Sequence, residues 1–87
     1  MGDYEAARPY YEKALEIRRE VLGQRHPSTA TSLNNLGVLC YYQGQLNEAI
    51  DFIGQALAIE EVVLGANHPS TKSTRDNLAF LTSKQTK

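Results

Sequence analysis

The chain has 87 residues, of which 41% are hydrophobic and 22% charged, so it has the composition of one small globular domain. The chain contains nine Lys and Arg residues and ten Asp and Glu residues, which gives a net charge of −1. This balance argues against partners that are recognised mainly by charge, such as nucleic acids and membrane surfaces. A single cysteine excludes an internal disulfide, and the N-terminal residues lack the apolar run of a signal peptide. We therefore expect a reducing, cytoplasmic location.

The sequence repeats itself with a period of 42 residues. Val-Leu-Gly occurs at 21–23 and again at 63–65, and His-Pro-Ser-Thr occurs at 26–29 and again at 68–71. Apolar residues before and between these blocks also align without a gap, so the chain is built from a duplicated unit.

Apolar residues recur at steps of three and four in each unit, which predicts helices, and no apolar–polar alternation of strand length is present. We predict four helices, over residues 3–22, 28–42, 46–64 and 70–83. Pro9 lies inside the first helix, where it removes one backbone hydrogen bond, so we expect a kink or fraying there. On the second helix, Leu33, Leu36 and Cys40 form a stripe that predicts burial.

Signals at the helix ends agree with these ranges, and each of the following residues recurs 42 positions later except Gly44. Gly23 follows the last periodic residue of the first helix, where a left-handed residue commonly ends a helix. Pro27 suits a first helical turn, because its missing N–H would have no partner there. The hydroxyls of Ser28 and Thr29 are expected to serve the same N-terminus. Gly44 interrupts the pattern between the second and third helices.

The helical hairpin formed by the second and third predicted helices resembles the tetratricopeptide repeat. The residues that carry the resemblance are Leu33-x-x-Leu36-Gly37, Tyr41-Tyr42-x-Gly44, Ala49 and Ala56. The common unit has about 34 residues, and the 42-residue unit is similar to the kinesin light chain and nephrocystin type. The resemblance implies an all-α solenoid of antiparallel helices in the order B–A–B–A. Residues 1–87 would be a single module, with the polar last helix as a C-terminal cap.

The sequence contains no set of side chains that would be expected to converge into a catalytic site or a metal site. His26 and His68 lie in equivalent turns of successive repeats, which stack about 8–10 Å apart, too far for equivalent atoms to share one metal. We expect Cys40 to be a buried, unreactive thiol. No phosphate-binding glycine motif occurs. We therefore expect a non-enzymatic protein without cofactors.

The resemblance implies that the first helix of each hairpin lines a concave groove. The groove positions carried over in this way are Thr31, Asn34, Val38, Tyr41, Tyr42, Ser73, Asp76 and Phe80. Asn34 could bond the backbone of an extended peptide, whereas Asn35, which recurs in the second copy, is interpreted as structural. The alternative is that these positions form a solvated surface, or that Asn34 and Asn35 form hydrogen bonds within the stack of helices.

The leading hypothesis is a protein–protein interaction module that binds a peptide or a partner chain in this groove. The rival is a structural element that stacks on further repeats or forms a homo-oligomer. Tyr4, Ala7, Tyr11 and Ala14 form a face without a preceding first helix, which favours self-association. The turn at 43–45 contains one helix breaker, so it is the expected place for a helix exchange between copies.

Overall fold

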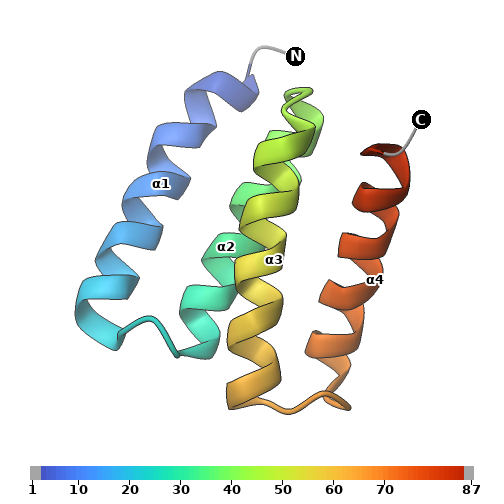
Figure 1. The fold of residues 1–87 in the computed structure, drawn as a ribbon. Helices are drawn as coiled ribbons and strands as arrows, with labels where there is room; N and C mark the ends of the chain where they lie inside the picture. The colour runs from blue at the N-terminus through green and yellow to red at the C-terminus, as the bar shows by residue number, and fades with distance from the viewer. Residues whose placement is uncertain (1–2, 86–87) are drawn as a thin grey trace.

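The computed structural model describes residues 3–85, which form four helices joined by short turns. The helices are α1 (Asp3–Leu22), α2 (Pro27–Tyr42), α3 (Leu46–Val63) and α4 (Pro69–Gln85). The prediction of an all-α fold with four helices is confirmed, and every boundary lies within two residues of its predicted position. Each helix packs against its neighbour in the sequence, with α3 between α2 and α4 (Figure 1). The result is a slab of 33 × 31 × 16 Å.

The helix ends follow the predicted signals. Gly23 and Gly65 have φ values of +92° and +94°, so both adopt the left-handed conformation expected after a helix C-terminus. Pro27 and Pro69 begin α2 and α4, where a missing N–H leaves no hydrogen bond unmade.

The caps of α2 and α4 differ from the expectation, because imidazole groups and not hydroxyls accept the free N–H groups. His26 Nδ1 accepts a hydrogen bond from the Ser28 N–H at 3.0 Å, and His68 Nδ1 accepts one from the Ser70 N–H at 3.0 Å. His26 has an extended backbone, with φ −131° and ψ 139°, which directs its ring over the first turn. The expected turn role of both histidines is therefore confirmed, with capping as its chemical basis.

The threonine hydroxyls of the repeated block instead tie each helix to the one before it. Thr29 Oγ1 donates to the Gly23 carbonyl at 2.8 Å, and Thr71 Oγ1 donates to the Glu60 carbonyl at 3.5 Å. Both threonines are fully buried. Each threonine thus bonds a carbonyl near or just beyond the end of the preceding helix, and the Glu60 carbonyl also accepts from the Leu64 and Gly65 N–H groups.

The core lies on both sides of α3 and contains the predicted stripe. One cluster joins α1, α2 and α3 and consists of Leu15, Ala30, Leu33, Leu36, Ala56 and Ile59. The other consists of Cys40, Ala49, Ile53 and Leu81. Phe52 packs against both clusters, so the core is continuous. Gly37 allows α2 and α3 to approach closely, because a Cβ at this position would lie 2.5 Å from Ile53 Cγ1.

Helix α1 runs without interruption through Pro9, so the expected fraying does not occur. Proline removes only one hydrogen bond near the N-terminus, and Pro9 is exposed, so its ring does not disturb the packing. The internal repeat shows how incomplete the packing of α1 is. Tyr11 is 42% exposed, whereas the equivalent Ile53 of α3 is 1% exposed. Ile17 is exposed where the equivalent Ile59 is buried, because α3 packs between two helices and α1 packs against α2.

Candidate binding groove

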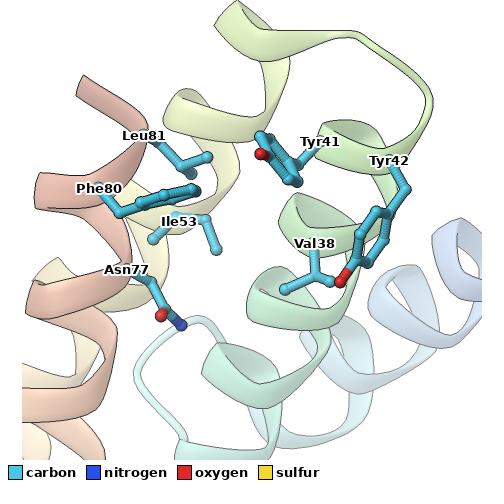
Figure 2. Close-up of a pocket in the computed structure, with 7 residues that line it drawn as sticks. All are labelled: Val38, Tyr41, Tyr42, Ile53, Asn77, Phe80 and Leu81. Atoms are coloured by element: carbon cyan, nitrogen blue, oxygen red, sulfur yellow. The ribbon is translucent and has the colours of Figure 1, made fainter. Parts of the chain in front are cut away.

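A groove runs along the molecule between α2 and α4, and α3 forms its floor. Its first part, the apolar cleft, has a volume of about 160 Å³ and is lined by Val38, Tyr41, Tyr42, Ile53, Asn77, Phe80 and Leu81. In Figure 2, Phe80 and Asn77 extend from α4 toward α2, while Tyr41 and Val38 face them from α2. Val38 is 41% and Phe80 49% exposed, so apolar surface remains open to a ligand.

Aromatic side chains extend this cleft in a connected series. The rings of Tyr41 and Phe80 meet edge to face, with centroids 5.7 Å apart and an interplanar angle of 70°. Tyr42 lies beside Tyr41 at 5.6 Å and stacks on Tyr4 of α1 at 5.5 Å. Lys84 Nζ lies 5.0 Å from the centroid of the Phe80 ring, within the range of a cation–π contact. Aromatic pairs of this geometry hold each other in place, so the cleft is preformed.

The second part of the groove, the polar cleft, continues toward the N-termini of α2 and α4. It has a volume of about 270 Å³ and is lined by Thr31, Asn34, Asn35, Glu60, Ser70, Ser73, Thr74 and Asn77. Asn77 lines both clefts, so the two parts are adjacent. Asn34 Nδ2 donates to Thr74 Oγ1 at 2.9 Å, which joins α2 to α4 across the floor.

Seven of the eight predicted groove positions line one of the two clefts. Val38, Tyr41, Tyr42 and Phe80 line the apolar cleft, and Thr31, Asn34 and Ser73 line the polar cleft. Asp76 lines neither of them.

Asn34 makes the structural contact that was expected of Asn35, although it also lines the polar cleft. Asn34 is partly buried and hydrogen-bonded to Thr74, whereas Asn35 is exposed. The repeat of Asn35 at position 77 suggested a structural role, but α2 presents its 31–34–38 face to α4, which brings Asn34 against that helix.

The floor of the groove was missed by the sequence interpretation. Ile53 and Glu60 of α3 lie under the apolar and polar clefts, and Leu81 and Asn77 of α4 close the sides. Ile53 and Glu60 are seven residues apart, and this spacing of two turns on one helix face was the available signal.

Outside the groove, charged side chains join α1 to the α2–α3 hairpin. Arg8 donates to Glu12 at 2.9 Å, to Glu48 at 3.0 Å and to Gln43 at 3.2 Å. The hydrogen bond from Arg8 lowers the pKa of the Glu48 carboxyl, and the hydrogen bonds to Glu48 and Glu12 raise the pKa of Arg8. Burial raises the pKa of the Cys40 thiol, and the side chain is fully buried, as expected for an unreactive cysteine.

Two further observations concern residues 3–85. No group of three or more His, Cys, Asp or Glu side chains in this range lies where it could hold a metal ion. None of the helices in the described part of the chain is both long and apolar enough to cross a bilayer.

Comparison with known proteins agrees with the architecture. Human "Tetratricopeptide repeat protein 19, mitochondrial" is 42% identical over 43 residues, which cover 49% of this chain and 11% of that protein. The chain thus spans about a ninth of the length of this relative. A family model described as "Tetratricopeptide repeat" matches residues 1–61, which is more than two thirds of the chain. Together with the helical hairpins, this match shows that the chain belongs to the tetratricopeptide repeat family.

Proposed function

We propose that the chain is a non-catalytic protein–protein interaction module that binds an extended peptide, or a segment of a partner chain, in the groove between α2 and α4. The observation that carries this proposal is the apolar cleft. Half-exposed apolar side chains from α2 and α4 gather there around a preformed opening, and such gathered side chains are typical of binding surfaces. Repeat proteins of this family are generally interaction modules, which supports the same reading.

The size of the groove limits the affinity. The apolar cleft of about 160 Å³ has room for one side chain of a ligand. Few other contacts are available on a surface of two helices, so we expect dissociation constants of about 1 μM or weaker, equivalent to about −8 kcal/mol at best.

Amide chemical-shift mapping with a library of short peptides tests the proposal. Binding should shift residues of α2 and α4 that line the groove. Phe80→Ala should weaken binding because it removes the half-exposed aromatic ring that α4 contributes to the apolar cleft, and Asn34→Ala should weaken it by disturbing the polar cleft. Tyr10→Ala is the matched control, because Tyr10 is 75% exposed on α1 and lies outside the groove. Shifts confined to α3, or equal binding by all three variants, would overturn the proposal.

A second candidate function is supported by the exposed face of α1. Tyr4, Tyr11 and Ile17 are 41%, 42% and 49% exposed, although their equivalents in α3 pack against a further helix. We propose that another helix covers this face, supplied either by a further repeat or by a second copy of the chain. The mass in solution tests self-association. The chain has a mass of 9.7 kDa, and a strictly monomeric state at high concentration would exclude a homo-oligomer.

Three finer assignments belong to the same proposal. The 42-residue period supports the kinesin light chain type of repeat. The polar substitutions on α4, where Arg75 and Thr82 replace Leu33 and Cys40, support a role for α4 as a cap. The free, buried thiol of Cys40 is compatible with a cytoplasmic location.

A further inference from the structure

The polar cleft contains two hydrogen-bond acceptors that nothing in residues 3–85 satisfies. Glu60 is 5% exposed, and its Oε1 atom is buried without a hydrogen-bond partner. Asn34 Oδ1 is also buried and unpartnered, although the amide group of the same side chain bonds Thr74. Both residues line the polar cleft.

A carboxylate in this position needs a donor. Buried charged groups in proteins are almost always paired, because removing an ion from water costs hydration free energy that only a partner group can offset. The basic residues of α4 do not provide the pair. Arg75 donates to the Ala66 carbonyl at 3.2 Å and lies 3.7 Å from Glu61. Arg75 and Lys72 are not among the α4 residues that line the cleft.

The internal repeat indicates which kind of group can bind beside Glu60 in the polar cleft. The residue equivalent to Glu60 in the first unit is Arg18, in the corresponding cleft between α1 and α2. Arg18 Nη1 donates to the Ser28 carbonyl at 3.2 Å and to Ser32 Oγ at 2.8 Å. In the α1–α2 cleft, a guanidinium of the chain itself therefore occupies the site.

The second unit has equivalents of the two acceptor residues but has Glu60 in place of Arg18. Ser70 and Thr74 are the equivalents of Ser28 and Ser32, and both line the polar cleft. Glu60 adds one more acceptor in place of the donor. The polar cleft thus contains the equivalents of both acceptor residues, of which Thr74 Oγ1 already accepts from Asn34, together with an added carboxylate and an open volume of about 270 Å³.

We propose that the polar cleft binds the guanidinium group of an arginine side chain in the partner peptide, with the Glu60 carboxylate and Asn34 Oδ1 as its acceptors. This inference rests on the proposed peptide-binding function and names the chemistry of the ligand. Guanidinium is favoured over ammonium for two reasons. Its planar set of five N–H donors can serve several acceptors at once, and it is more weakly hydrated, so it enters a buried site more easily.

The floor of the groove also sets the position of this arginine in the peptide. Ile53 and Glu60 are seven residues apart on α3, which corresponds to about 10 Å along the helix. An extended chain advances about 3.3 Å per residue. Only alternate side chains of an extended chain share a face, so the partner should carry an apolar side chain for the apolar cleft and an arginine two or four positions away.

The first experiment tests the polar cleft without requiring a peptide to bind. N-acetyl-arginine methylamide and its uncharged analogue N-acetyl-citrulline methylamide are titrated into the full chain, and amide shifts are followed. We expect saturable shifts at Thr31, Asn34 and Ser73 with the arginine compound in the millimolar range, and much smaller shifts with citrulline. Glu60→Gln should abolish the difference. The matched control is Glu61→Gln, which removes the neighbouring exposed carboxylate and should retain the difference. Equal shifts from both compounds in the unchanged protein would overturn the inference.

The second experiment separates this inference from the proposed function. Two blocked alanine-based heptapeptides carry leucine and arginine two or four positions apart, and variants of each replace arginine with citrulline or leucine with alanine. Replacing arginine should weaken binding to the unchanged protein about tenfold or more, the loss expected for a charge-assisted hydrogen bond, and should have little effect on binding to Glu60→Gln. If only the leucine matters, the groove function stands and the arginine site is refuted. If neither residue matters, both proposals fail.

Discussion

The contact between Gly37 and Ile53 gives the sharpest test of the fold, because α2 and α3 could not approach as they do with any larger residue at position 37. A Cβ at Gly37 would lie 2.5 Å from Ile53 Cγ1, 2.6 Å from Ile53 Cδ1 and 3.3 Å from the Ala49 carbonyl oxygen. Ile53 is 1% exposed and cannot move aside without disturbing the core. Gly37→Ala therefore forces the two helices apart or pushes Ile53 from its rotamer.

The expected magnitude follows from two opposing effects. Overpacking a filled core costs about 1–3 kcal/mol, and the contact with a buried branched side chain places this case in the upper half of that range. Alanine recovers about 1 kcal/mol over glycine in a helix interior. The net loss is then about 1–2 kcal/mol, which lowers the Tm of a domain of this size by about 4–16 °C in a thermal melt followed by circular dichroism.

Gly54→Ala is the matched control, because Gly54 also lies inside a helix but a Cβ there would meet nothing within 4 Å. This variant should gain about 1 kcal/mol and melt about 4–8 °C higher than the parent. In an Ile53→Ala background, Gly37→Ala should destabilise much less, since the two closest atoms are gone and only the Ala49 carbonyl oxygen at 3.3 Å remains. The reasoning is refuted if Gly37→Ala and Gly54→Ala have the same Tm.

Three further predictions follow from single contacts. Ala56→Leu should lower the free energy of unfolding by about 1–3 kcal/mol, because Ala56 is fully buried at the α2–α3 interface, and a melt within a degree or two of the parent would contradict this. Gly44→Ala should raise the oligomer fraction in light scattering, because φ at Gly44 is +84° and alanine strains the turn while favouring a continuous helix; an unchanged mass distribution would count against exchange at this turn. The hydrogen bond from Arg8 lowers the pKa of the Glu48 carboxyl in the folded protein. The stability that this hydrogen bond contributes is therefore present above the unfolded pKa of about 4.3 and is lost as the pH falls through the lower folded pKa. Glu48→Gln should therefore reduce the loss of Tm between about pH 7 and about pH 3, and an unchanged loss would show that the Arg8 contact is unimportant in solution.

The helices and their ends could be predicted from the sequence because their causes are local. The steps of three and four between apolar residues define each buried face, and Gly23, Pro27 and their copies mark the ends, so the bounds were correct to within two residues. The stripe of Leu33, Leu36 and Cys40 was also correctly expected to be buried. Even here the capping group was misassigned. A hydroxyl two residues into a helix and an imidazole before it are both plausible partners for a free N–H, and the backbone direction at His26 decides between them.

The groove required the tertiary structure. Its walls are first helices of two repeats and could be carried over from a resemblance, but its floor is made by the helix that connects them. Whether Asn34 or Asn35 faces α4 depends on how α2 is rotated about its own axis. Adjacent residues point about 100° apart around a helix, and both asparagines flank the apolar stripe, so the periodicity does not show which of them faces α4. The sequence by itself determined that the chain is a duplicated helical unit with a common core pattern. The tertiary structure alone showed that Glu60 Oε1 has no hydrogen-bond partner in the second unit, whereas Arg18, at the equivalent position of the first unit, bonds Ser32. The physical reason is that a buried charge is paired by side chains that are distant in sequence and close in space.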